Sequence, residues 1–184
     1  MRKRYLFLVV AFTFGMVLHM VEQYTTGVSN EFSEVTQEEA EYYGERLIHR
    51  QYGDNGLLQQ TMTAQESEYF SERGLTLFTQ PAIVGQNVDG NWQINAAQGE
   101  VSDHSSQLAL SGNVTIQSIA RDPDFLIVET SELTYHPERG EARSSQPVTL
   151  RTRWGVTKAS GFSMDTSSQR LTLQSNVRTH YEQD

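Results

Sequence analysis

The stretch Gln107-Leu-Ala-Leu-Ser-Gly-Asn-Val-Thr-Ile116 decides the fold of this chain. Large apolar residues alternate with smaller or polar ones on both sides of an interruption at residues 111–113. Alternation with a period of two, in short runs separated by polar turn residues, is typical of half-buried antiparallel strands. Similar alternation surrounds Phe78 and Leu171. The stretch therefore predicts strands rather than helices.

This stretch belongs to a pattern that the sequence repeats four times. Each copy contains a small residue, then a bulky apolar residue after four intervening positions. After twelve further positions comes a third residue, which is apolar in every copy and directly follows Pro or Asn. Successive copies start 32, 34 and 29 residues apart, a spacing typical of stacked supersecondary units that bury one another's faces. The copies are Ala64, Tyr69 and Ala82; Ala96, Val101 and Val114; Thr130, Tyr135 and Val148; and Ala159, Met164 and Val177.

Turn-forming residues separate the strands within each copy. Gly, Pro, Asp and Ser favour turns through their φ preferences and their side-chain hydrogen bonds to the local backbone. These segments and two further hairpin signals predict about a dozen short antiparallel strands in an all-β body. The alternation alone does not distinguish a packed core from an open groove, and a filled core is favoured as the more common outcome. The turn segments are residues 71–74, 102–106, 136–140 and 165–169, with hairpin signals at residues 54–56 and 89–90.

The N-terminus has the features of a membrane anchor. Residues 5–21 carry no charge and follow three basic residues, Arg2, Lys3 and Arg4. As a helix this run reaches about 25 Å, which narrowly spans a bilayer core. No small-residue cleavage site follows it, so an uncleaved anchor is favoured over a signal peptide. The positive-inside rule then predicts that the rest of the chain is exported.

Three segments follow from this pattern. Residues 1–21 are predicted to be a cytoplasmic stub and anchor. Residues 22–46, rich in Glu, are predicted to be an acidic linker. Residues 47–184 are predicted to be the β body.

Composition and motifs exclude several classes of function. Residues 22–184 carry 11 basic against 23 acidic residues, a net charge of −12 that argues against nucleic-acid binding. The chain has no cysteine. Asp103, His104 and Ser105 are adjacent, whereas a catalytic triad converges from separate elements. Glu129 and Glu132 are interpreted as solvated strand and turn residues rather than glycosidase acids. No catalytic residue, metal site or cofactor is therefore predicted.

Three motifs resemble the LptC family of lipopolysaccharide export proteins. They are Leu77-Phe78-Thr79-Gln80-Pro81, Ser160-Gly161-Phe162-Ser163-Met164 and Val177-Arg178-Thr179-His180-Tyr181-Glu182. The order of anchor, acidic linker and repeats resembles the same family. The resemblance implies a twisted, open antiparallel β-jelly roll whose apolar face is a groove. It also implies a single-pass inner-membrane protein with a periplasmic body, which receives lipopolysaccharide from the LptBFG ABC transporter and passes it to LptA.

Two sets of site residues follow from the resemblance and the alternation. The hypothesis for the groove lining is Phe78, Ile83, Val84, Leu108, Leu110, Val114, Ile116, Tyr135, Val148, Leu150, Leu171 and Leu173. The last strand is expected at an exposed sheet edge, where it adds to a strand of LptA; its residues are Leu171, Leu173, Val177, Thr179 and Tyr181. A homodimer, an exported scaffold with a closed β core and a membrane-anchored polysaccharide hydrolase remain as alternatives.

Overall fold

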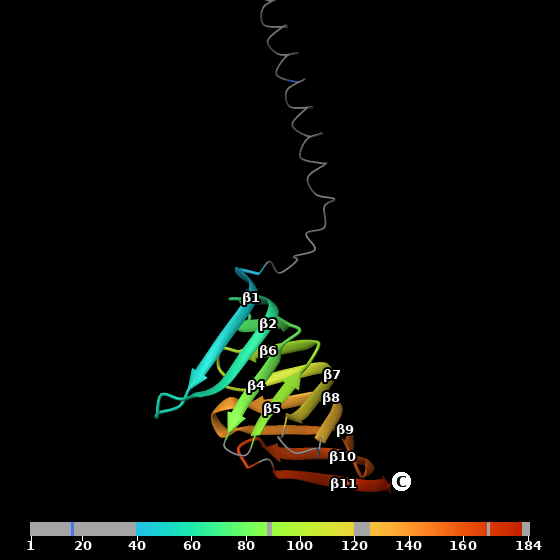
Figure 1. Cartoon of the computed structure of the whole chain (residues 1–184). Coiled ribbons are helices and arrows are strands. Elements are labelled where there is room, and N and C mark those ends of the chain that lie inside the picture. Colours follow the sequence, from blue (N-terminus) through green and yellow to red (C-terminus); the bar gives the residue numbers. More distant parts are fainter. Residues whose placement is uncertain (1–15, 17–39, 88–89, 120–125, 169, 182–184) are drawn as a thin grey trace, which may run out of the picture. The chain divides into compact units, whose positions relative to one another are not determined.

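A computed structural model describes residue 16 and residues 40–87, 90–119, 126–168 and 170–181 (Figure 1). The predicted anchor, apart from Met16, and the predicted linker up to residue 39 lie outside this part. Among the residues that are described, no helix has the length and apolar character needed to cross a membrane.

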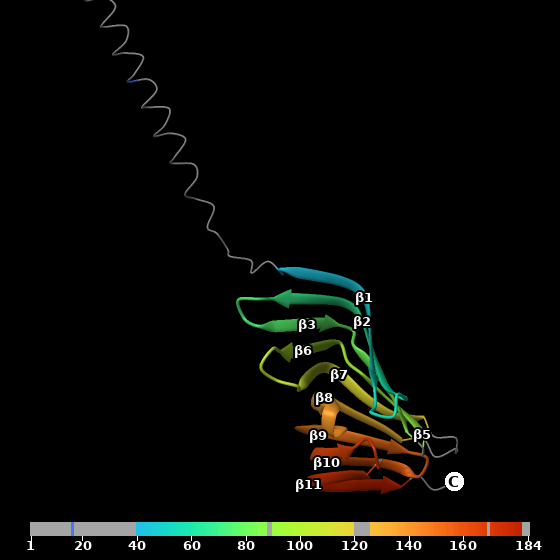
Figure 2. The same cartoon turned by 90° about the vertical axis from the view of Figure 1, so that its left-hand side faces the viewer.

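The described chain folds into one sheet of eleven antiparallel strands. From one edge the order begins with β1 and β2. Both β3 and β4 pair with β2; β3 then pairs with β6, β4 pairs with β5, and β6 and β5 both pair with β7. From β7 the strands follow in chain order to β11 at the other edge. Figure 2 shows the strands stacked from β1 to β11. The elements are β1 (Tyr42–Tyr52), β2 (Leu58–Phe70), β3 (Leu75–Thr79), β4 (Ala82–Asn87), β5 (Gly90–Asn95), β6 (Gln98–Ser102), β7 (Leu108–Ile119), β8 (Leu126–His136), the 3-10 helix η1 (Pro137–Arg139), β9 (Glu141–Thr152), β10 (Gly155–Asp165) and β11 (Arg170–Tyr181).

The sheet bends along a line that the repeated sequence pattern marks. Val114, Thr130, Val148 and Ala159 are paired in turn across β7 to β10, so the third position of one copy lies beside the first position of the next. The strand register shifts next to this row in each of the three pairings. Asn113 has a φ of 48°, a conformation that Asn tolerates better than most residues. The repeat therefore positions the bend of each long strand.

The bend divides the sheet into two halves. The β3 half-sheet contains β3, β6 and residues 42–45, 66–70, 108–111, 132–136, 141–145, 162–165 and 170–175. The β4 half-sheet contains β4, β5 and residues 47–52, 58–64, 114–119, 126–130, 148–152, 155–159 and 177–181.

The core lies between the two half-sheets. Val114, Val128 and Phe162 are 0 % exposed, and Ile94, Ile116 and Tyr135 are 1 % exposed. Full burial of such a side chain contributes about 1.5 to 3 kcal/mol. The middle of the interior is thus filled with side chains.

The structure confirms the all-β prediction and corrects two details. β1 begins at Tyr42, inside the segment predicted as linker, because an edge strand exposes most of its side chains and shows little alternation. Seven strands have 11 to 13 residues, so they are not short; each passes through the bend instead of ending there. The predicted turns at residues 71–74, 102–106 and 136–140 connect consecutive strands as expected, and the fourth, at residues 165–169, falls between β10 and β11, with residue 169 outside the described part.

Candidate functional site

The inner face of the β3 half-sheet forms one continuous row from edge to edge. Each residue in the row is the Cα partner of the next. The row is Tyr42, Tyr69, Thr76, Val101, Leu108, Tyr135, Ala142, Met164 and Leu171. Tyr42 is 66 % exposed and stacks on Tyr69 at 6.0 Å, whereas the middle of the row is buried and Leu171 is half-buried. The row is therefore open at the β1 edge, closed in the middle and partly open at the β11 edge.

The β4 half-sheet carries a matching row on its inner face. Its members, again paired from strand to strand, are His49, Met62, Ile83, Ile94, Ile116, Val128, Leu150, Thr157 and Thr179. The four central residues are 0 to 2 % exposed, while His49 and Thr179 at the two edges are exposed. The interior is thus lined with apolar side chains on both sides, and its two ends coincide with the edge strands β1 and β11.

A polar contact joins the two half-sheets across the interior. The Tyr135 hydroxyl donates to Gln60 Oε1 at 2.6 Å, and Gln60 Nε2 donates to Gln51 Oε1 at 2.6 Å. We call these three residues the clasp. Burial raises the pKa of the Tyr135 phenol, so the hydroxyl remains a donor at neutral pH.

An aromatic contact supports the clasp. The Trp92 ring meets the Tyr135 ring edge to face, with centroids 5.6 Å apart. Gly85 is the strand partner of Trp92, and a Cβ at residue 85 would overlap the indole ring. Glycine is therefore needed at this position for Trp92 to lie against the sheet and reach Tyr135.

Most of the predicted groove residues meet in this interior. Seven of them are buried in the core, at 0 to 3 % exposed: Ile83, Leu108, Leu110, Val114, Ile116, Tyr135 and Val148. Four are partly buried and pack against that core: Phe78, Leu150, Leu171 and Leu173. Val84 is the exception, because it follows Ile83 along β4 and so projects from the opposite face of the sheet.

The residues predicted to contact a partner lie on a true sheet edge, as expected. β11 pairs only with β10. Val177 and Tyr181 are 51 % and 71 % exposed, and Thr179 is exposed, although its hydroxyl is 2.9 Å from that of Thr157. Leu171 and Leu173 instead pack against the core. The half of β11 beyond the bend is thus the accessible half.

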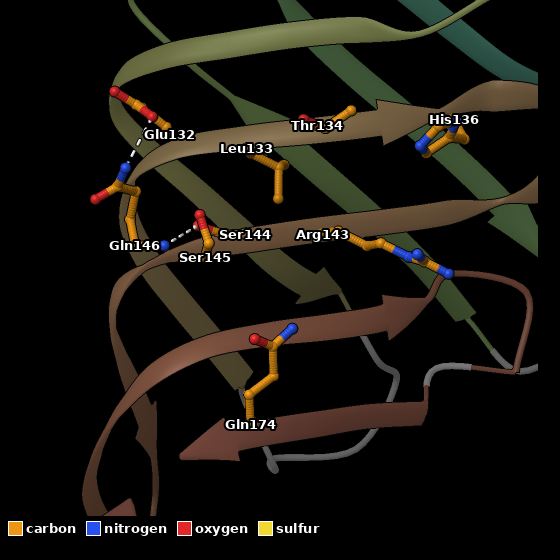
Figure 3. Close-up of a pocket in the computed structure, with 9 residues that line it drawn as sticks. All are labelled: Glu132, Leu133, Thr134, His136, Arg143, Ser144, Ser145, Gln146 and Gln174. Carbon is orange, nitrogen blue, oxygen red and sulfur yellow. Dashed lines mark hydrogen bonds between the residues drawn. The ribbon is translucent and has the colours of Figure 1, made fainter. Parts of the chain in front are cut away.

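Polar hollows lie along β8 and β9. One of about 390 Å³ is lined by Glu132, Leu133, Thr134, His136, Arg143, Ser144, Ser145, Gln146 and Gln174 (Figure 3). Gly161 of β10 leaves room there, since a Cβ on it would meet the Gln174 side chain. Gln146 Nε2 donates to Glu132 Oε2 at 3.0 Å. The Gln146 backbone N–H donates to Ser144 Oγ at 3.1 Å, so Gln146 links two of the polar groups of this hollow.

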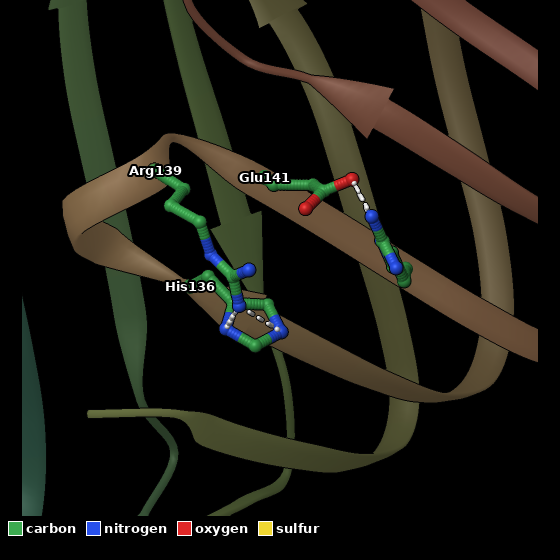
Figure 4. Close-up of polar contacts among 4 residues, drawn as sticks. His136, Arg139 and Glu141 are labelled. Carbon is green, nitrogen blue, oxygen red and sulfur yellow. Dashed lines mark hydrogen bonds and ion pairs between the residues drawn. The ribbon is translucent and has the colours of Figure 1, made fainter. Parts of the chain in front are cut away.

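The charged groups near this hollow are also paired (Figure 4). Arg143 Nε donates to Glu141 Oε1 at 2.6 Å. Arg139 Nη2 lies 2.6 Å from His136 Nδ1, and because a guanidinium can only donate, Nδ1 is the acceptor. The arginines therefore interact with neighbouring side chains and do not form an open anion site.

The residues weighed for catalysis have structural partners. Asp103 accepts a hydrogen bond of 2.7 Å from the Tyr69 hydroxyl, which raises the pKa of Tyr69. Glu129 pairs with Arg151 at 3.0 Å. In the described part of the chain, no three His, Asp or Glu residues are grouped so that they could hold a metal ion.

Sequence reasoning missed several interior residues. Gln60 is polar, and a polar residue in a half-buried strand usually faces solvent, so nothing singled it out. Trp92 and Ile94 alternate after the hairpin signal at residues 89–90, and that alternation could have found them. Val128 lies in a strand that the sequence marks only by its repeat positions, and Phe162 lies in one of the three family-like motifs but was not singled out as an interior residue.

Fold and site together define a class of protein: a bent antiparallel β-jelly roll with an apolar interior that runs between two free sheet edges. Residues 6–182 match the family described as "Lipopolysaccharide-assembly, LptC-related". The chain therefore belongs to the LptC-related family of lipopolysaccharide-assembly proteins.

Individual relatives agree with this assignment. The lipopolysaccharide export system protein LptC of Escherichia coli K12 is 27% identical over 136 residues, covering 71% of this chain and 69% of the relative. The protein of the same name from Shigella flexneri matches with the same values. Among solved structures, LptH, the LptA homologous periplasmic component of the lipopolysaccharide transport device of Pseudomonas aeruginosa, superposes with a TM-score of 0.51 at 8% identity. The superposed region covers 67% of this chain and 95% of the LptH chain. That likeness concerns the fold.

Proposed function

We propose that this protein carries lipopolysaccharide through its interior from the β1 edge to the β11 edge. It receives the lipid from the LptBFG ABC transporter and passes it to LptA. The observation that carries the proposal is the pair of inner rows, which together cross every strand and whose exposed members, Tyr42, His49 and Thr179, lie on β1 and β11. Residues 5–21 anchor the chain in the inner membrane, with the β body in the periplasm.

The interior suits acyl chains on energetic grounds. Each methylene removed from water contributes about 0.8 kcal/mol, so a lipid with several acyl chains needs an apolar enclosure to cross an aqueous compartment. The side chains that fill the interior must part to admit such a chain. Separation of the two half-sheets breaks the hydrogen bond from Tyr135 to Gln60, whereas the strand ladders of each half-sheet remain intact. The clasp therefore opposes entry, and the lipid offsets that cost.

The lining is proposed to comprise the predicted groove residues without Val84, which lies on the outer face. Photocrosslinking tests this assignment, with a matched pair on β7. A photoreactive residue at Leu110, which is buried inside, should label lipopolysaccharide in an ATP-dependent way. The same residue at Ala109, which is exposed on the outer face, should not. Equal labelling from both positions would contradict an interior path.

The β11 edge is proposed to add to a strand of LptA by backbone pairing, since its outer side has no strand partner in the described chain. Removal of residues 177–184 takes away the exposed half of β11 and leaves Leu171 and Leu173 in place on the core. We expect the body to fold and LptA binding to be lost. Unchanged binding would show that LptA docks elsewhere.

The filled middle of the interior supports a second candidate function, an exported scaffold with a closed β core and no lipid cargo. The scaffold predicts no lipid labelling from Leu110 under any condition, together with partner binding through β11. The photocrosslinking experiment therefore separates the two candidates.

A further inference from the structure

Charge is distributed unevenly over the β body. The chain as a whole has 23 acidic and 14 basic residues. Residues 141–181, which form β9 to β11, carry two acidic residues, Glu141 and Asp165, against six basic ones. The sheet edge formed by these strands is therefore basic in an otherwise acidic protein. The basic residues are Arg143, Arg151, Arg153, Lys158, Arg170 and Arg178.

Two of these bases face each other at the edge. Lys158 of β10 and Arg178 of β11 are direct Cα partners, and both are exposed on the outer face. Like charges directly opposite each other destabilise an antiparallel pair. Among the described residues, neither forms an ion pair. The isolated sheet gains nothing from this arrangement, so an external anionic group is the natural counterpart of the two charges.

Aromatic residues lie beside this basic pair. Trp154, in the turn between β9 and β10, is 63 % exposed, and the Arg153 guanidinium lies 4.7 Å above its ring. The next residue, Gly155, pairs with Tyr181, which is 71 % exposed. Trp, Tyr and Arg dominate the binding energy of protein interfaces. The corner thus combines aromatic anchors, positive charge and the free backbone of β11.

We propose that this corner docks an acidic strand edge of the periplasmic partner, with Lys158 and Arg178 as the complementary charges and Trp154 and Tyr181 as the anchors. The proposal rests on the strand addition at β11 that is part of the proposed function, and it specifies the chemistry of the partner. A protein strand is favoured over a lipid surface because the charges flank unpaired backbone, and another strand can pair with that backbone along its length.

A second copy of this chain does not fit the same corner. If the two half-sheets continued in register, residues 177–181 would lie beside residues 47–52 of the second copy, which include Arg50. Arg178 would then face another positive charge. The basic edge therefore selects a different chain and disfavours head-to-tail self-association.

The test measures binding of the full chain in detergent to a purified LptA-type jelly roll. The double variant Lys158→Glu/Arg178→Glu should associate about tenfold or more slowly at low salt, because charge complementarity acts mainly on the association rate. The difference should disappear near 1 M salt, where the screening length is about 3 Å. Arg50→Glu, an exposed outer-face change on the opposite edge strand, should bind as the parent does. Circular dichroism and the urea midpoint verify that each variant is folded.

Each outcome decides a separate point. Parent-like association of the double variant at low salt would overturn the charge proposal, and strand addition would stand if removal of residues 177–184 still abolished binding. If that truncation bound normally, the proposed docking at β11 would itself be wrong. If the double variant lost binding to phosphatidylglycerol vesicles but kept its binding to the jelly roll, the corner would be a lipid-binding surface, which also contradicts the proposal.

Discussion

At the scale of single residues, the Tyr135 hydroxyl has an unusual place, because it donates a hydrogen bond across the interior from one half-sheet to Gln60 of the other. Removal of this hydroxyl by Tyr135→Phe leaves Gln60 Oε1 without its donor from β8 and keeps the ring against Trp92. Loss of a buried hydrogen bond costs about 1 to 2 kcal/mol, and we expect that loss in the free energy of unfolding measured with urea.

Tyr181→Phe is the matched control for this change. Tyr181 is 71 % exposed, so loss of its hydroxyl should change the free energy of unfolding by less than about 0.5 kcal/mol. Equal effects of the two substitutions would mean that the clasp does not hold the half-sheets together.

The sequence predicts these interior residues unevenly. Leu108 and Leu110 are found by alternation, and Tyr135 and Val148 by their repeat positions. Neither alternation nor the repeat identifies Gln60 or the contact between Gly85 and Trp92. The role of Gln60 depends on which strands face each other across the interior, and the Gly85–Trp92 contact depends on the register of β4 with β5. Val84 was assigned to the wrong face, since two consecutive apolar residues leave the direction of alternation undecided.

At the scale of elements, the bend of β7 depends on a residue that accepts positive φ. Asn113 has a φ of 48°, and a left-handed conformation costs an ordinary side chain about 1 to 2 kcal/mol. Asn113→Val should therefore destabilise the body by about that amount, whereas Asn113→Gly should be tolerated. Thermal unfolding measures both.

Asn91→Val provides the comparison for this prediction. Asn91 is exposed in β5 and lies outside the bend, and Val favours strands, so this change should not destabilise the protein. If Asn113→Val were as harmless as Asn91→Val, the bend would not depend on residue 113.

The turn between β10 and β11 gives a pH-dependent prediction. Hydrogen bonds from Ser168 and the Ser167 backbone N–H hold the pKa of Asp165 below its usual range. A carboxyl group whose pKa is lowered by folding stabilises the native state above its unfolded pKa, near 3.9, and loses that effect as the pH falls through its folded pKa.

The variant Asp165→Asn isolates this effect. It should be less stable than the parent at neutral pH, and the difference should shrink as the pH falls below about 4. Urea midpoints across this pH range provide the measurement. A stability difference that stays constant would show that the carboxylate charge has no role in the turn.

Elements differ in how well their sequences predict them. The turns were predicted correctly because Gly, Pro, Asp and Ser act locally. β1 was missed because an edge strand buries little, and Glu41 and Glu45 gave it the composition of a linker. The length of β7 to β11 was underestimated because a bend and a turn interrupt alternation in the same way.

At the scale of the whole molecule, the sheet connects two different edges through one interior. The β1 edge carries exposed aromatic residues, Tyr42, Tyr43 and Tyr52, and the β11 edge carries the basic corner. Two chemically distinct edges suit a protein that docks different partners at its two ends. In the proposed function, the inner rows link one partner to the other.

The central claim is that lipopolysaccharide passes between the half-sheets, and a reversible staple across the clasp tests it most directly. The chain has no cysteine, so Gln60→Cys/Tyr135→Cys can be joined specifically by a short cleavable reagent that reacts with two thiols. The measurement is ATP-dependent transfer of lipopolysaccharide from membranes to LptA. We expect the stapled protein to block transfer and cleavage of the staple to restore it. Transfer at the same rate with the staple in place would contradict the account.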